Sequence, residues 1–173
     1  AKTTDTLGHI CSWGVGSEGE VFGLGIYSSG AVSIGGDADL IAPTAINDGE
    51  WHHIAITLDT GGGGEVTIYV DGQSDISATT SNDGNSFAFS GLATGSESEF
   101  NIGNKADTAI ATLFSYISSD LMLSGVAVHD TVLSQAAIRD MIDYGFDSGT
   151  GVRKTDIKDR SDVYYYWDMN ADI

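Results

Sequence analysis

The chain has 173 residues, of which 41% are hydrophobic, so it is long enough for one domain around a single buried core. It carries 25 acidic residues against 7 basic ones, and this net charge of −18 disfavours binding to nucleic acid or to anionic membranes. No segment approaches the ~18 consecutive apolar residues of a transmembrane helix, so membrane insertion is not expected.

Short runs of alternating apolar and polar residues, separated by glycine-rich turns, dominate the chain in order. The clearest runs lie at 7–14, 20–36, 51–59 and 65–72, and others at 87–92, 99–103, 111–117, 120–128 and 162–167. Together with 23 glycines and 1 proline, they predict an all-β fold, an antiparallel sandwich or barrel. One segment differs, because apolar residues recur at helical spacing between Ser134, a candidate N-cap, and Gly145, a candidate stop. It predicts one short helix near residues 134–144.

The single cysteine and two adjacent histidines are the first candidates for chemistry. Cys11 is the only cysteine, so no intramolecular disulfide can form, and it is predicted to pack as a small apolar residue. Alternation puts Trp51 and His53 on one strand face and His52 on the other, with Ile54, Ile56 and Leu58. One imidazole is therefore expected to be buried and hydrogen-bonded, and both histidines are interpreted as scaffold.

The stretch NDGEWHHIAITLDTGGGGEVTIYVDG (47–72) resembles the signature of laminin-G-like domains, which fall among the concanavalin A-like lectins and glucanases together with the pentraxins. The likeness extends over nearly the whole chain, through HICSWG, FNIGN, LMLSGVAVHDTVLSQAAIRDMIDYG and DVYYYWDMN. The resemblance implies a single domain over 1–173, an antiparallel two-sheet jelly-roll sandwich. It also implies structural roles for Trp51, His52, His53, Asp71 and Gly72.

Some concanavalin A-like proteins are glycosidases, and retaining glycosidases need two carboxylates about 5 Å apart. The nearest candidates are the pairs Glu18/Glu20 and Glu97/Glu99, which lie in turns rich in glycine and serine or at the starts of strands. No third acid completes the pattern that laminarinase-type members carry. No catalytic residue is therefore assigned, and the chain is predicted not to be an enzyme.

The resemblance implies instead a recognition or adhesion module that binds carbohydrate or a protein surface through rim loops. Laminin-type members hold calcium with an aspartate after the early hairpin and oxygens near the late strand. The matching positions here are Asp37, Asp39 and Asp130, although the usual asparagine of the second region is missing. Calcium is the one cofactor that this resemblance suggests. Tyr27 and Phe87 lie near loops and are the aromatic candidates for a sugar platform.

The alternative function is a structural domain without a small ligand, and either function predicts an extracellular, cell-surface or virion-surface location. Family members usually carry an apolar strand before the segment that resembles GHICSWG, whereas AKTTDT precedes Leu7 here. A sandwich without that strand exposes a sheet edge. The closing segment 162–170 could pair with residues 7–13, the chain could be a fragment, or a neighbouring subunit could add a strand and so drive self-assembly. The first of these is favoured.

Overall fold

The computed structural model describes residues 1–14, 21–35, 40–59, 65–79, 99–103, 120–129, 131–145 and 163–167. Within them the chain forms strands and one helix, α1, which spans Gln135–Gly145 and follows β9. The strands are β1 (Gly8–Gly14), β2 (Val21–Ile26), β3 (Ala31–Gly35), β4 (Leu40–Ala45), β5 (Ile54–Asp59), β6 (Glu65–Val70), β7 (Gln73–Thr79), β8 (Glu99–Ile102), β9 (Val126–His129) and β10 (Val163–Trp167).

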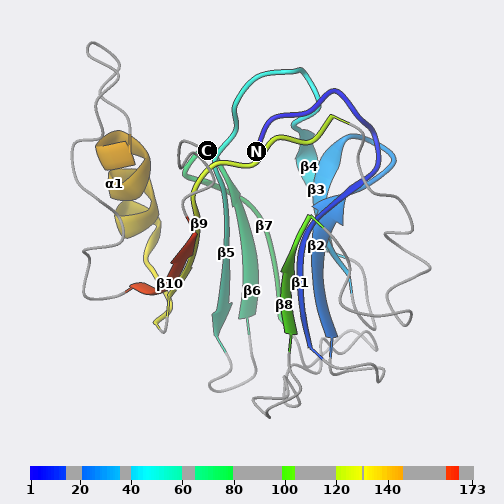
Figure 1. The fold of residues 1–173 in the computed structure, drawn as a ribbon. Helices are drawn as coiled ribbons and strands as arrows, with labels where there is room; N and C mark the ends of the chain where they lie inside the picture. The colour runs from blue at the N-terminus through cyan, green and yellow to red at the C-terminus, as the bar shows by residue number, and fades with distance from the viewer. Residues whose placement is uncertain are drawn as a thin grey trace.

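The strands form an antiparallel two-layer sandwich, as the sequence predicts. One layer is a five-stranded sheet in the order β4-β3-β2-β1-β8. Facing it lies a three-stranded sheet in the order β5-β6-β7, with the β9-β10 pair beside β5 and α1 on the outer side (Figure 1). The core between the layers is apolar and draws on both sheets: Ile10, Cys11, Leu24, Ile26, Val32, Ile34, Leu40, Ala42, Ile46, Val66, Ile68 and Val70.

Two strands that the sequence pattern did not predict, β4 and β7, lie at the edges of their sheets. β4 contains Pro43, which has no N–H to donate and is tolerated at an edge. β7 has the polar sequence QSDISAT, and it has a neighbouring strand on one side only. The two edges are tied together by Asp75 of β7, which accepts hydrogen bonds from the backbone N–H of Thr44 at 3.0 Å and its hydroxyl at 2.7 Å.

The predicted helix is confirmed, and its cap is the predicted one. The hydroxyl oxygen of Ser134 accepts a hydrogen bond from the N–H of Ala137 at 3.2 Å, and Ile138 and Met141 are buried. The helix docks on the β6–β7 turn, because Gln135 and Arg139 both donate to the carbonyl oxygen of Gly72, at 3.0 and 2.9 Å.

The predicted position of the closing strand is wrong. β10 pairs antiparallel with β9, from Val163 opposite His129 to Trp167 opposite Val126, and not with residues 7–13. Both edges of β1 are already occupied, by β2 on one side and β8 on the other. In the part of the chain that is described, no helix is long and apolar enough to cross a membrane.

Candidate functional site

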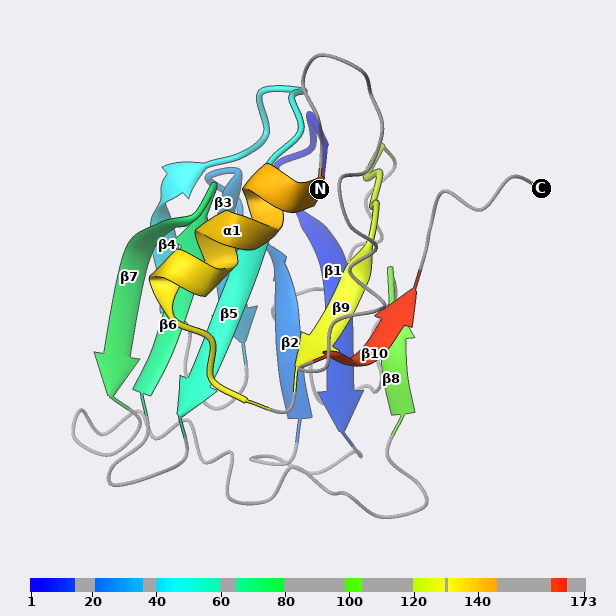
Figure 2. The same cartoon turned by 90° about the vertical axis from the view of Figure 1, so that its left-hand side faces the viewer.

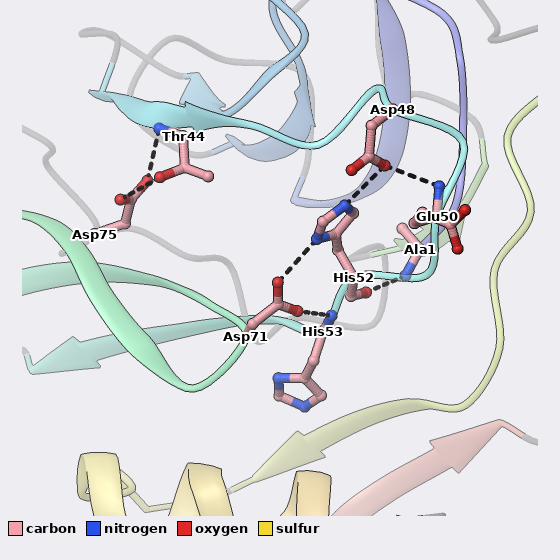
Figure 3. A network of polar contacts seen from close by, with 8 residues as sticks. All are labelled: Ala1, Thr44, Asp48, Glu50, His52, His53, Asp71 and Asp75. Atoms are coloured by element: carbon pink, nitrogen blue, oxygen red, sulfur yellow. Dashed lines mark hydrogen bonds and ion pairs between the residues drawn. The ribbon is translucent and has the colours of Figure 1, made fainter. Parts of the chain in front are cut away.

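The Trp51-His52-His53 element lies at one end of the sandwich, in the connection between β4 and β5. The β6–β7 turn, formed by Asp71 and Gly72, lies at the same end. Both turn residues have positive φ, 51° and 72°, which is the geometry of a type I′ hairpin turn and explains the Asp-Gly sequence. Figure 3 shows how these segments converge around His52.

His52 is held between two carboxylates. Its Nδ1 lies 2.9 Å from Asp71 and its Nε2 lies 3.0 Å from Asp48, while only 14% of the side chain is exposed. Burial opposes the charged imidazole, but the hydrogen bonds to Asp71 and Asp48 outweigh it and raise the pKa of His52. The pKa of Asp48 is lowered by the backbone N–H of Glu50 and then by His52. The result is a hydrogen-bonded bridge from the loop before β5 to the β6–β7 turn.

Asp71 fastens the turn a second time. Its other carboxylate oxygen accepts a hydrogen bond from the backbone N–H of His53 at 2.9 Å, and its own N–H donates to the carbonyl oxygen of His53 at 2.8 Å. The imidazole of His52 is hydrogen-bonded at both nitrogens but half-buried, so it has only the second of the two expected properties. Both partner carboxylates lie in short Asp-Gly turns, at 48–49 and 71–72.

His53 has a different environment. Its ring points away from the carboxylates, toward the side where β9 and α1 lie (Figure 3). Its Nδ1 is buried and has no hydrogen-bond partner among the described residues. Burial, and then the nearby ammonium of Ala1, lower the pKa of His53 to about 4, so the ring is neutral at pH 7.

The N-terminal segment forms a short ladder with two other segments at this end. Ala1 and His52 exchange backbone hydrogen bonds of 2.6 and 2.8 Å, and the N–H of Gly49 donates to the carbonyl oxygen of Thr3. On the other side Lys2 and Met122 exchange bonds of 3.0 and 2.9 Å. We call these three segments, 1–4, 49–52 and 120–122, the terminal ribbon.

Asp120 fixes one end of the terminal ribbon. Its carboxylate accepts hydrogen bonds from the hydroxyls of Thr3 and Thr4, and from the backbone N–H of Thr4 at 2.8 Å. These bonds, the Thr3 hydroxyl first, lower the pKa of Asp120 to about 2. The segment AKTTDT, which is too polar for an apolar strand, is thus ordered by backbone pairing and by one aspartate.

The ribbon presents two exposed apolar side chains, Trp51 and Met122, in line with Lys2 between them. Because Ala1 lies opposite His52, Lys2 lies opposite Trp51 on one side and opposite Met122 on the other. Residues opposite one another in such a ladder project from the same face. Trp51 is 52% exposed and Met122 49%, whereas Thr3, on the other face, is buried. We call Trp51, Lys2 and Met122 the Trp51 row.

The arrangement suits binding better than proton transfer. Both ring nitrogens of His52 already contact carboxylates, so neither is free for a substrate, and His53 is buried. The Trp51 row, by contrast, offers an aromatic face fixed on a hydrogen-bonded ribbon. The sequence pattern predicted a structural role for Trp51. The signal for exposure was that Trp51 directly follows the Asp48-Gly49 turn, and β5 begins only at Ile54.

Most of the other predicted site residues cannot be placed. Asp37, Asp39, Asp130 and Phe87, like Glu18, Glu20 and Glu97, lie outside the described residues, so the predicted calcium site stays a prediction. Within the described segments no three His, Cys, Asp or Glu side chains gather as metal ligands would. Tyr27 is half-buried and precedes β3. Asp37 and Asp39 come after Gly35, the last residue of that strand, in the sequence.

Two remaining predictions can be compared with the described residues. Cys11 is buried in the core as predicted, and burial raises the pKa of its thiol to about 12. Gly72, for which a structural role was predicted, lies where a Cβ would be 2.8 Å from Cγ of Arg139 and 2.9 Å from Cδ1 of Ile142, so α1 packs directly on this position.

Comparison with known proteins agrees with this architecture. A laminin G-type model of the concanavalin A-like lectin/glucanases superfamily matches residues 2–139. A candidate carbohydrate-binding protein of Bacteroides ovatus has a similar structure, with a TM-score of 0.64 and 16% identity over 98% of this chain and 43% of that one. This chain thus spans less than half the length of the Bacteroides protein.

Two looser structural similarities complete the comparison. Domains LG4-5 of the mouse laminin alpha1 chain give a TM-score of 0.45 and 16% identity, over 69% of this chain and 30% of theirs. An S-layer domain-containing protein of Clostridium thermocellum gives 0.39 and 21%, over 79% of this chain and 64% of its own. No curated protein sequence matches the chain.

Proposed function

We propose that this chain, which belongs to the concanavalin A-like lectin/glucanase superfamily, is a non-catalytic recognition module that binds carbohydrate through the Trp51 row. The observation that supports this most is the half-exposed Trp51, which lies on a segment hydrogen-bonded to residues 1–3. An indole packs well against the apolar face of a pyranose, and a platform that is already fixed loses little entropy on binding.

Polar residues for sugar hydroxyls lie next to Trp51 in the chain and in the ribbon. Glu50, which precedes Trp51, is exposed, and Lys2 lies opposite Trp51 in the ribbon. A carboxylate accepts and an ammonium donates hydrogen bonds, so both kinds of partner that a hydroxyl needs are present. A protein surface is the competing ligand class, because an exposed tryptophan and an exposed methionine in one row also suit a protein interface.

The proposal does not depend on a metal. The predicted calcium ligands Asp37, Asp39 and Asp130 lie outside the described residues, and calcium binding there remains a separate proposal. It predicts a higher melting temperature in millimolar calcium than in chelator, lost in the double variant Asp37→Ala with Asp39→Ala. Magnesium at matched ionic strength controls for screening of the net charge of −18.

A glycan array tests the proposed function. The wild type should bind a defined set of glycans in the presence of chelator, and Trp51→Ala should lose that binding. Val132→Ala is the matched control, because Val132 is also a large apolar residue, 54% exposed, but lies near the start of α1 and outside the ribbon. A blank array, or a pattern unchanged by Trp51→Ala, contradicts the proposal. A cell or virion surface, where such glycans are displayed, remains the predicted location.

A further inference from the structure

The terminal ribbon lies at one end of the sandwich. Its three segments, 1–4, 49–52 and 120–122, come before β1, β5 and β9 in the chain. Figure 2 shows that these three strands all begin at the end of the sandwich where the N-terminus lies. The segments that lead into the strands therefore meet at this end, although they are far apart in the sequence.

The Trp51 row runs across the three segments, so its length follows from how their backbones pair. Ala1 and His52 exchange hydrogen bonds, so the next pair along the ladder, Lys2 and Trp51, is a non-hydrogen-bonded pair. Lys2 and Met122 form a hydrogen-bonded pair. Opposite Cα atoms are about 4.5 Å apart in the first kind of pair and about 5.5 Å apart in the second. Trp51 and Met122 are thus separated by about 10 Å across the ribbon.

The surrounding structure holds the exposed residues at this separation. Leu121 and Leu123, on either side of Met122, pack against the buried core. His52, which follows Trp51, is hydrogen-bonded through its ring to two carboxylates. Trp51 and Met122 are two of the three large apolar side chains that are exposed in the described part of the chain. The row therefore presents two apolar contacts at a defined spacing.

A flat polysaccharide chain has a matching repeat. In a β-1,4-linked chain of pyranoses each residue advances the chain by about the spacing of two neighbouring strands. Successive residues are turned over, so every second residue presents the same face. If one pyranose stacks on the indole of Trp51, the next but one reaches Met122, and Lys2 lies beneath the residue between them.

We propose that the Trp51 row binds three consecutive residues of an uncharged, β-1,4-linked polysaccharide that crosses the ribbon from Trp51 to Met122. This inference rests on the proposed function, because it names the class of glycan that the same surface takes. Chains that curve or coil, such as β-1,3- and α-1,4-linked glucans, do not lay three successive residues along a straight row. The net charge of −18 disfavours chains of uronic acids or sulfated sugars.

The contacts at the two ends of the row are unequal. The indole of Trp51 offers a broad, rigid face, whereas the side chain of Met122 is smaller and flexible. A disaccharide that covers Trp51 and Lys2 should therefore already bind, and a third residue should add the contact with Met122. The apolar area buried in that contact predicts a gain in affinity of about three- to tenfold.

The test measures the affinity of the full chain for β-1,4-linked oligosaccharides of glucose, mannose and N-acetylglucosamine, from the monosaccharide to the hexasaccharide, by isothermal titration calorimetry. In the series that binds best, the Kd should decrease by about three- to tenfold from the disaccharide to the trisaccharide and change little beyond it. Met122→Ala should remove this gain and leave the Kd of the disaccharide unchanged. Met122→Leu, which keeps an apolar side chain of similar size, should retain most of the gain. Trp51→Ala should weaken binding at every length.

Failure of this inference differs from failure of the proposed function. If Trp51→Ala abolishes binding but Met122→Ala changes the disaccharide and the trisaccharide equally, or neither, the proposed function stands and the three-residue site is wrong. The inference alone also fails if binding that depends on Trp51 is tighter for β-1,3- or α-1,4-linked oligosaccharides of equal length. If no glycan binds, or if Trp51→Ala binds like wild type, both are wrong.

Discussion

Adjacent histidines in one short segment have opposite electrostatic environments. His52 is hydrogen-bonded to two carboxylates that raise its pKa, whereas His53 is buried, neutral at pH 7 and without a partner for Nδ1 among the described residues. Their effects on stability should therefore appear on opposite sides of neutral pH. The strand alternation predicted from the sequence separates the two rings, but the partners of His52 come from turns 4 and 19 residues away, and only the folded chain brings the second one close.

The first prediction concerns His52. The pKa of His52 is higher in the folded chain than its ordinary value of 6.5, so its stabilising bonds are complete below about pH 6.5 and weaken as pH rises through the raised pKa. His52→Ala should lower the free energy of unfolding by about 1–3 kcal/mol at pH 6 and by less at pH 9. Urea denaturation of wild type and variant at each pH measures this difference.

Comparison at each pH is needed because the Ala1 amine acts in the other direction. Burial lowers its pKa from 8.0 to about 6, so the amine makes the free energy of unfolding decrease as pH falls through that range. This effect is common to wild type and variant and largely cancels in the difference. A cost of His52→Ala that is the same at pH 6 and pH 9 would contradict a raised pKa of His52 in the folded chain.

The second prediction concerns His53. Its pKa of about 4 in the folded chain, against an ordinary 6.5, means that the unfolded chain binds the proton more readily between these values. Wild-type stability should therefore decrease as pH falls from about 6.5 to about 4. His53→Leu should leave stability at pH 7 within about 1 kcal/mol of wild type, since no hydrogen bond of the ring is shown to be lost. His53→Leu should also make the decrease in the free energy of unfolding between pH 6.5 and pH 4 smaller. If urea denaturation shows the same decrease with pH in wild type and variant, His53 is not a buried neutral ring.

At the scale of elements, the sequence predicted strands with a regular alternation of apolar and polar residues better than strands without one. β5 and β6 alternate because one face of each meets the core, so their pattern is regular. β4 and β7 each have a neighbour on one side only, and Pro43 and the polar sequence of β7 conceal them. The partner of β10 could not be predicted, because strand pairing between distant segments leaves no local pattern in either of them.

The third prediction tests how α1 is held on the β6–β7 turn. Gly72→Ala adds a Cβ to a residue with φ of +72°, and this Cβ would also meet Arg139 and Ile142. Gly103→Ala is the matched control, because Gly103 also has φ of +72° but nothing lies within 4 Å of its added Cβ. Both should be destabilised by about 1 kcal/mol or more through backbone strain, and Gly72→Ala should lose a further ~1–2 kcal/mol. Equal unfolding midpoints would show that the helix is not packed on this turn.

At the scale of the molecule, the excess of acids bears on which ligands can approach. A net charge of −18 repels sulfated and uronic-acid polysaccharides over a range set by the ionic strength. The fourth prediction is that neutral glycans bind with affinities that change less than about threefold between 50 and 500 mM salt. Surface plasmon resonance across that range measures it. Tight binding of an acidic polysaccharide at low salt would show that a local basic surface outweighs the overall charge.

The family, the sandwich and the helix could be predicted from the sequence, because they rest on local patterns and on a specific motif. The candidate site could be predicted only in part. Trp51 was noticed as part of the motif, but its exposure depends on pairing between residues 1–4, 49–52 and 120–122, which are far apart in the chain. No periodicity in any one of these segments indicates that Lys2 and Met122 lie in line with it.

The central claim is that carbohydrate binds on the Trp51 row, and the affinity for a single glycan tests it most directly. With the strongest glycan from the array, isothermal titration calorimetry should give Trp51→Ala a Kd at least about tenfold higher than wild type, or about 1.4 kcal/mol. Val132→Ala should bind like wild type, and all three proteins should unfold at similar temperatures. An unchanged Kd for a folded Trp51→Ala protein would contradict the account and place the binding surface elsewhere on the sandwich.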